Sequence, residues 1–143
     1  MLVSHILKEK GRDVVAIPPY ATLYEAARIL AINRIGALVV LTRDGGFDGM
    51  ISERDIVHAL AEKGEGALSL SVTARMVRDI ASCEETDTIE EIMDTMTWCH
   101  FRHLPVVKSG FVVGVVSIGD VVKTRITETI REAQALKHYI ATG

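Results

Sequence analysis

One seven-residue pattern that occurs twice constrains this sequence more than any other feature. It reads Gly-Met-Ile-Ser-Glu-Arg-Asp at residues 49–55 and Gly-Val-Val-Ser-Ile-Gly-Asp at residues 114–120, so glycine, two apolar residues, serine and aspartate keep their places. Each copy predicts a buried strand that ends at the serine, followed by a helix whose first turn presents a hydroxyl and a carboxylate. The recurrence indicates a repeated unit with a place to hold a ligand.

The same Ser-x-x-Asp spacing also has a purely structural interpretation. Serine is a favoured N-cap residue, and an acidic residue in the first turn stabilises a helix, so many such helices bind nothing. A single copy favours this simpler interpretation, whereas two copies in matching contexts favour a ligand site.

The residues around the motif repeat as well. A capping box precedes a predicted helix in each half, at 22–25 and at 88–91. The apolar stripe of the first helix returns 66 positions later in the second, while the serine and aspartate return after 65 positions, so one turn has lost a residue. The two stripes are Leu23, Ala26, Ala27 and Leu30, and Ile89, Ile92, Met93 and Met96.

Each half therefore predicts the order β-α-β-β-α over about 55 residues, which is too short to bury its own core. The fold class is α/β (α+β), with two pseudo-symmetric repeats packed as one module. In the first half we expect strands at 14–17, 37–41 and 47–51, and helices over 23–33 and from Glu53 onward, the latter burying Ile56, Val57 and Leu60. In the second half we expect strands at 80–83 and 104–107, with a polar linker at 62–66 between the halves.

Both ends of the chain add helical patterns. Apolar residues at Leu2, Val3, Ile6 and Leu7 predict a lead-in helix that stops at Gly11. A final helix from about Gly119 has an apolar stripe that either docks on a second subunit or folds back on its own domain. The stripe consists of Val122, Ile126, Ile130, Ala133, Leu136 and Ile140. The expected domains are the lead-in helix at 1–9, repeats at 10–63 and 75–128, and a C-terminal extension at 129–143.

Composition limits the partners and the location. Sixteen basic and nineteen acidic residues give a net charge of −3, which argues against broad binding to nucleic acid or to an anionic membrane. No apolar run approaches the ~20 residues of a membrane span, and the start does not resemble a signal peptide, so we expect a cytoplasmic protein. Cys83 and Cys99 form no Cys-x-x-Cys pair, and we expect both to be reduced thiols.

Catalytic and metal-binding patterns are weak. Cys99, His100 and His103, with Cys83 as a fourth group, are soft-metal ligands in type, but their spacing matches no closed structural site. The sequence has no serine-histidine-acid order and no phosphate-loop glycine pattern. We expect no metal, no catalytic cofactor and no enzymatic activity.

The repeated patterns resemble the CBS domain, named after cystathionine β-synthase. The first copy is carried by residues 17–27, 35–40 and 49–55, and the second by residues 88–93, 103–107 and 114–120. The resemblance covers roughly residues 10–128 and implies a stand-alone tandem pair. In that family the pair forms a disc-like, often dimeric module with a regulatory role, so the resemblance implies a homodimer and a protein target that the sequence does not identify.

The resemblance also implies two clefts for adenosine nucleotides: AMP foremost, or ATP, NAD(H) or S-adenosylmethionine. The motif aspartate would receive the ribose hydroxyls, because one carboxylate can accept from two vicinal hydroxyls, and the serine would lie near the ribose-phosphate. In the family each aspartate faces the other repeat. Carried over, one cleft would comprise Met50, Ser52, Asp55, Ile80, Ala81, Phe101, Arg102 and His103, and the other Val14, Val15, Ile35, Gly36, Ala37, Ser117 and Asp120.

Several of these residues have simpler interpretations. Val14, Ile35 and Ile80 would be buried core in any fold, and Arg102 and His103 could be solvated charges at the entry of a strand. The rival function is a dimerising interaction scaffold with vestigial clefts.

The two clefts are expected to differ in charge. Arg102 and His103 favour the Asp55 cleft for a phosphorylated ligand, because Gly36 and Ala37 hold the corresponding positions in the first repeat. Lys8, Lys10 and Arg54 are long enough to change this balance.

Overall fold

The computed structural model describes residues 1–142 and divides into two compact units. The first-repeat unit comprises Asp13–Ile80 with Val107–Val113, and the second-repeat unit comprises Met1–Arg12, Ala81–Val106 and the chain from Gly114 onward. The lead-in segment thus belongs to the same unit as the second repeat. Gly143, the last residue of the predicted extension, lies outside the described residues.

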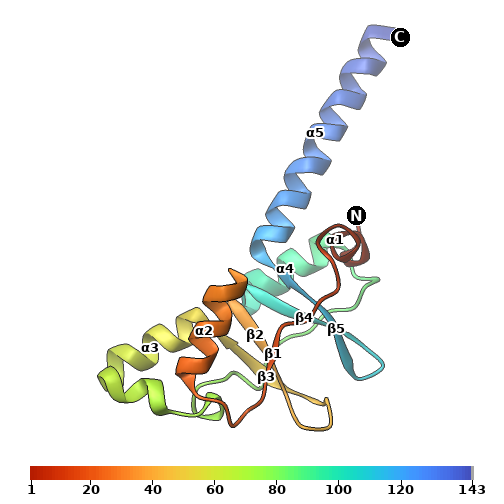
Figure 1. Cartoon of the computed structure of the whole chain (residues 1–143). Coiled ribbons are helices and arrows are strands. Elements are labelled where there is room, and N and C mark those ends of the chain that lie inside the picture. The colour runs from red at the N-terminus through yellow and green to blue at the C-terminus, as the bar shows by residue number, and fades with distance from the viewer. Residues whose placement is uncertain (143) are drawn as a thin grey trace. The chain divides into compact units, whose positions relative to one another are not determined.

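The first-repeat unit contains a three-stranded sheet in the order β1 (Ala16–Ile17), β2 (Ala37–Leu41) and β3 (Phe47–Ser52). Strand β1 pairs with β2 in parallel, and β2 pairs with β3 in antiparallel fashion (Figure 1). Two helices, α2 (Leu23–Asn33) and α3 (Glu53–Lys63), and two short 3₁₀ helices, Gly64–Ser69 and Val72–Ala74, complete it. Its core includes Ile17, Leu23, Leu38, Val40, Ile51, Ile56 and Val72.

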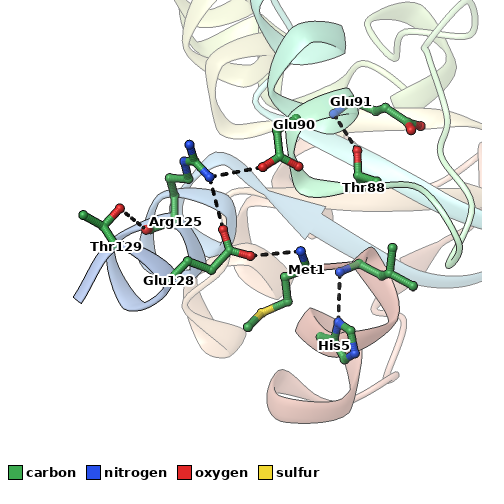
Figure 2. A network of polar contacts seen from close by, with 9 residues as sticks. Met1, His5, Thr88, Glu90, Glu91, Arg125, Glu128 and Thr129 are labelled. Atoms are coloured by element: carbon green, nitrogen blue, oxygen red, sulfur yellow. Dashed lines mark hydrogen bonds and ion pairs between the residues drawn. The ribbon is translucent and has the colours of Figure 1, made fainter. Parts of the chain in front are cut away.

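The second-repeat unit contains α1 (Val3–Lys10), α4 (Ile89–Cys99), the two-stranded sheet of β4 (His103–Lys108) and β5 (Phe111–Ser117), and α5 (Ile118–Thr142). Residues Val107–Val113, which include the turn between β4 and β5, belong to the first-repeat unit. Helix α4 begins as α2 does: Thr88 Oγ1 accepts the Glu91 amide at 3.2 Å (Figure 2), and Thr22 Oγ1 accepts the Glu25 amide at 3.1 Å. Both helices end in a left-handed residue, Arg34 or His100.

The predicted strand at 80–83 is wrong, since only Cys83 forms a bridge, in parallel with Val106. Proline explains the difference. In the first repeat the Val39 amide donates to Val15 O at 3.2 Å, but the residue 66 positions after Val39 is Pro105, which has no amide proton. Pro105 can only accept, from the Cys83 amide at 3.0 Å.

Helix α3 buries a narrower face than the one predicted, which includes Ile56 as expected. Ile56 and Ala59 are buried, whereas Val57 is 60% exposed and Leu60 37% exposed, so the expectation that both are buried is wrong. The inward stripe is narrow because a single i, i+3 pair meets the core. The predicted linker at 62–66 is also structured, since α3 runs to Lys63 and a 3₁₀ helix follows at once. In α4, Met93 of the predicted stripe is exposed.

Helix α5 is the long helix at the C-terminal end of the chain, and its later turns extend away from α1 and α4 (Figure 1). An ion-pair network holds its first half (Figure 2): Glu128 lies 3.0 Å from the amino group of Met1 and 3.3 Å from Arg125, which lies 3.1 Å from Glu90. The bond from the Met1 ammonium, followed by Arg125, lowers the pKa of Glu128. Residues 129–142 are exposed, so the fold-back alternative is not observed.

Candidate ligand-binding site

The first Ser-x-x-Asp motif lies where β3 passes into α3. Asp55 Oδ2 accepts the Ser52 amide at 2.8 Å and the Ser52 hydroxyl at 2.9 Å, and Ser52 Oγ accepts the Asp55 amide at 3.3 Å. This is a reciprocal capping arrangement. The motif therefore caps the helix and also holds a half-buried carboxylate at its positive end.

The second motif lies where β5 passes into α5 and repeats this geometry. Asp120 Oδ2 accepts the Ser117 amide at 2.9 Å, and Ser117 Oγ accepts the Asp120 amide at 3.2 Å. Here a lysine also takes part: Lys10 Nζ lies 2.7 Å from Asp120 Oδ2 and donates to Val115 O at 2.9 Å. Burial by itself would raise the pKa of the Asp120 carboxyl, but the bonds from Lys10 and Ser117 outweigh it and the pKa is lowered.

A backbone bond ties each motif to the strand entry of its own repeat. The Glu53 amide donates to Gly36 O at 2.9 Å, and the Ile118 amide donates to Arg102 O at 2.8 Å. Sequence reasoning missed these two carbonyl groups, because the repeat aligns positions 36 and 102 without showing what they contact. The bonds fix the start of β2 and the loop before β4 beside the first residue of the motif helix.

The motif glycines have a steric role that the sequence does not reveal. A Cβ at Gly49 would lie 2.6 Å from Val77 O, because the residue after it, Met50, exchanges two backbone hydrogen bonds with Val77 at 2.9 and 2.8 Å. A Cβ at Gly114 would instead meet the side chain of Leu7, at 2.7 Å from Cδ2. The lack of a side chain at each glycine therefore allows a neighbouring segment to approach β3 or β5 closely, just before the serine and aspartate.

The predicted site residues divide between the two units. In the first-repeat unit, Met50 and Ala37 are buried and the others are half-buried, namely Val14, Val15, Ile35, Gly36, Ser52, Asp55 and Ile80. In the second-repeat unit, Arg102 is exposed and the others are half-buried, namely Ala81, Phe101, His103, Ser117 and Asp120. The structure brings each serine together with its own aspartate. The grouping of the remaining residues into two clefts stays a prediction.

A hollow of about 480 Å³ lies in the first-repeat unit between the end of α2 and the start of α3. Ile35 and Gly36, two of the predicted site residues, line it together with Arg34, Glu53 and apolar side chains of both helices. Asp55 and Ser52 do not line it. The hollow is therefore separate from the carboxylate of the first motif.

Among residues 1–142, no cluster of three or more His, Cys, Asp or Glu side chains could hold a metal ion. Burial, with a smaller effect of Asp87, raises the pKa of the Cys83 thiol to about 12, so it stays protonated at neutral pH. In the same described range, no helix has both the length and the apolar character needed to cross a membrane.

Comparison with known proteins places these features in one family. The model of the CBS domain matches residues 3–62 and 71–127. The CBS domain-containing protein CBSX3, mitochondrial, of Arabidopsis thaliana is 31% identical over 150 residues, which cover 99% of this chain and 72% of that protein.

Solved structures agree with that assignment. The CBS-domain containing protein ATU1752 from Agrobacterium tumefaciens is 42% identical with a TM-score of 0.85, over 87% of this chain and 92% of that one. The CBS domain protein PAE2072 from Pyrobaculum aerophilum, solved with AMP, is 32% identical with a TM-score of 0.75, over 84% of this chain and 89% of that one. The predicted mixed α and β class and the two predicted repeats are confirmed. The chain belongs to the CBS domain family and contains two CBS repeats.

Proposed function

We propose that this protein is a non-enzymatic regulatory module that binds an adenosine nucleotide, AMP foremost, through its two Ser-x-x-Asp motifs. The observation that carries the proposal is the matching geometry of the motifs, each of which holds a half-buried aspartate at the start of a helix. The AMP complex of the Pyrobaculum aerophilum relative supports an adenosine ligand. CBS pairs are generally regulatory, which supports the absence of a catalytic role.

The capping role of each aspartate is compatible with ligand binding. In both motifs the capping bonds reach Oδ2 and leave Oδ1 outside the capping arrangement. Oδ1 is therefore available to accept a bond from a ribose hydroxyl. A bond to a charged acceptor in a half-buried site is stronger than a neutral one in water, so a fixed carboxylate can select a vicinal diol.

The other parts of the proposal come from the sequence. ATP, NAD(H) and S-adenosylmethionine remain candidate ligands because they share the adenosine group. The predicted lining residues from the opposite repeat and the cytoplasmic location also remain predictions. A protein target would respond to the nucleotide-bound form.

Calorimetry with AMP and 2′-deoxy-AMP tests the ribose assignment directly. We expect AMP to bind more tightly, by about tenfold or more, because the deoxy ligand loses a bond to a charged acceptor. Asp55→Asn and Asp120→Asn should each remove binding at their own motif, whereas Glu53→Gln, a matched change in the first turn of α3, should not. Equal affinity for the two ligands would reject the ribose assignment.

Thermal-shift screening distinguishes a nucleotide-binding module from the alternative function, a dimerising interaction scaffold. A nucleotide at 100 times its dissociation constant should add about 2.7 kcal/mol to the free energy of unfolding. If AMP, ADP, ATP, NAD, NADH and S-adenosylmethionine all leave the melting temperature unchanged, the dimerising scaffold with vestigial clefts is the better description.

We also propose that the protein is a homodimer in which α5 pairs with α5 of a second copy. The large apolar side chains of its stripe are 49–70% exposed, namely Val122, Ile126, Ile130, Leu136 and Ile140. Six positions along the helix follow one another at alternating spacings of four and three residues, as in the seam of a coiled coil. They are Val122, Ile126, Thr129, Ala133, Leu136 and Ile140.

Charge favours a parallel pairing of the two helices. In a parallel pair, Glu132 flanks the seam opposite Lys137 of the partner subunit, and the two-fold axis makes this attraction twice. An antiparallel pair with the same seam would set Glu132 beside Glu132 of the partner subunit. It would also set Lys123 beside Lys137 of the partner subunit, and both contacts are repulsive.

A further inference from the structure

The two motifs differ in one contact, which joins residues that are far apart in the sequence. Lys10, the last residue of α1, places Nζ 2.7 Å from Asp120 Oδ2 and 2.9 Å from Val115 O, so its ammonium group is fixed by two acceptors. The side chains are 38% and 22% exposed, which leaves the pair open to solvent on one side. All three residues belong to the second-repeat unit.

In the described part of the first-repeat unit, no lysine is placed at the first motif in this way. Within the first-repeat unit, Asp55 accepts bonds only from Ser52, and no lysine or arginine of that unit forms an ion pair with it. Arg75 lies 65 positions after Lys10, the same offset that separates the two motifs. It forms an ion pair with Glu62 at 2.6 Å. The repeat therefore conserves the serine and aspartate but supplies a cation from within the same unit at only one of them.

The remaining bonding capacity of the pair defines what it can recognise. An ammonium group has three protons, and two of those on Lys10 are directed at Asp120 and Val115. The third proton and Asp120 Oδ1 offer one donor and one acceptor side by side. The charge of Lys10 also offsets that of Asp120, so an anion approaching this motif meets a locally neutral pair instead of a bare carboxylate.

We propose that Lys10 is a ligand-binding residue of the Asp120 motif, where it allows a phosphorylated nucleoside to bind beside the carboxylate that receives the ribose. This inference rests on the proposed function. The sequence favours the Asp55 site for a phosphorylated ligand and leaves open whether Lys8, Lys10 or Arg54 evens the balance. Lys10 is the one of these that lies at the Asp120 motif. The ligand class is a ribonucleoside monophosphate, with AMP as the probe.

The test isolates the second motif by calorimetry in an Asp55→Asn background. We expect Lys10→Met to weaken AMP binding by about tenfold or more and adenosine binding by less, since the lost bond joins two charged groups. Lys10→Arg should retain most of the AMP affinity because it keeps the charge. Lys8→Met, two residues earlier on the same helix, is the matched control and should change neither ligand. Melting temperatures verify that each variant is folded.

Each contrary outcome has a distinct meaning. If Lys10→Met binds AMP as tightly as its parent, or more tightly, Lys10 is only a tether or a competitor and the inference is wrong. If the Asp55→Asn parent binds no AMP although the unmutated protein does, the Asp120 motif is not a nucleotide site, which overturns the inference but leaves the proposed function at Asp55. If the unmutated protein binds no adenosine nucleotide, the proposed function itself fails.

Discussion

Lys10 Nζ lies 2.7 Å from Asp120 Oδ2, although the two residues are 110 positions apart in the chain. The contact joins the end of α1 to the first turn of α5 and lowers the pKa of Asp120. It makes two motifs that share the same serine and aspartate chemically unequal.

This ion pair predicts a pH dependence of stability. The folded-state pKa of Asp120 is lowered from its ordinary value of 3.8, so the stabilisation is complete above that value and is lost as pH falls through the folded-state pKa. At pH 7 we expect Lys10→Met to reduce the free energy of unfolding by about 0.5–1 kcal/mol, as for other partly exposed pairs. Urea unfolding at pH 7, 5 and 3 measures it. A difference that grows toward pH 3 would contradict this assignment.

The two motif glycines should respond differently to the same substitution. Gly49→Ala places a methyl group against the backbone of Val77, which cannot move alone, and should cost about 2–3 kcal/mol. Gly114→Ala meets only the side chain of Leu7, which can change rotamer, and should cost about 1 kcal/mol. Equilibrium unfolding of both variants compares them. Equal costs would mean that the strand beside Gly49 adjusts as easily as a leucine side chain.

The seam of α5 predicts which residues hold the dimer. Ile126→Asn should shift the protein toward the monomer in sedimentation equilibrium, because it places a polar group in the apolar seam. Arg131→Asn, on the opposite face of the same helix, is the control and should leave the association constant unchanged. A protein that is monomeric at tens of micromolar before any substitution would refute the homodimer.

A single charge reversal distinguishes the two orientations of the helices. Lys137→Glu should weaken a parallel dimer, since it replaces an attraction to Glu132 of the partner subunit with a repulsion. The same change would strengthen an antiparallel dimer by removing the repulsion from Lys123. The double variant Glu132→Lys with Lys137→Glu should restore the parallel dimer, and its failure to do so would reject the parallel arrangement.

The two cysteines should differ in reactivity. Cys99 is exposed, whereas Cys83 is buried and burial raises the pKa of its thiol to about 12. Iodoacetamide at pH 8 should therefore label one thiol in the folded protein and two in urea, as counted by mass spectrometry. A Cys99→Ser variant that is still labelled rapidly without urea would show that the core around Cys83 opens.

Much of the fold could be predicted from the sequence because its signals are local. The caps at Thr22 and Thr88 and the two Ser-x-x-Asp motifs join residues three positions apart, so their spacing alone determines the hydrogen bonds. The same holds for the bounds of α2 and β2, which follow from apolar periodicity.

What only the tertiary structure decided involves residues far apart in the chain. The missing amide proton of Pro105 costs a strand hydrogen bond only because the fold places the segment around Cys83 next to it. Val57 is exposed because α3 packs on the core through Ile56. The sequence named Lys10 as one of three long basic side chains, but only the folding of α1 against the start of α5 brings it to Asp120. Local patterns determine which groups a segment presents, and long-range packing determines which groups meet.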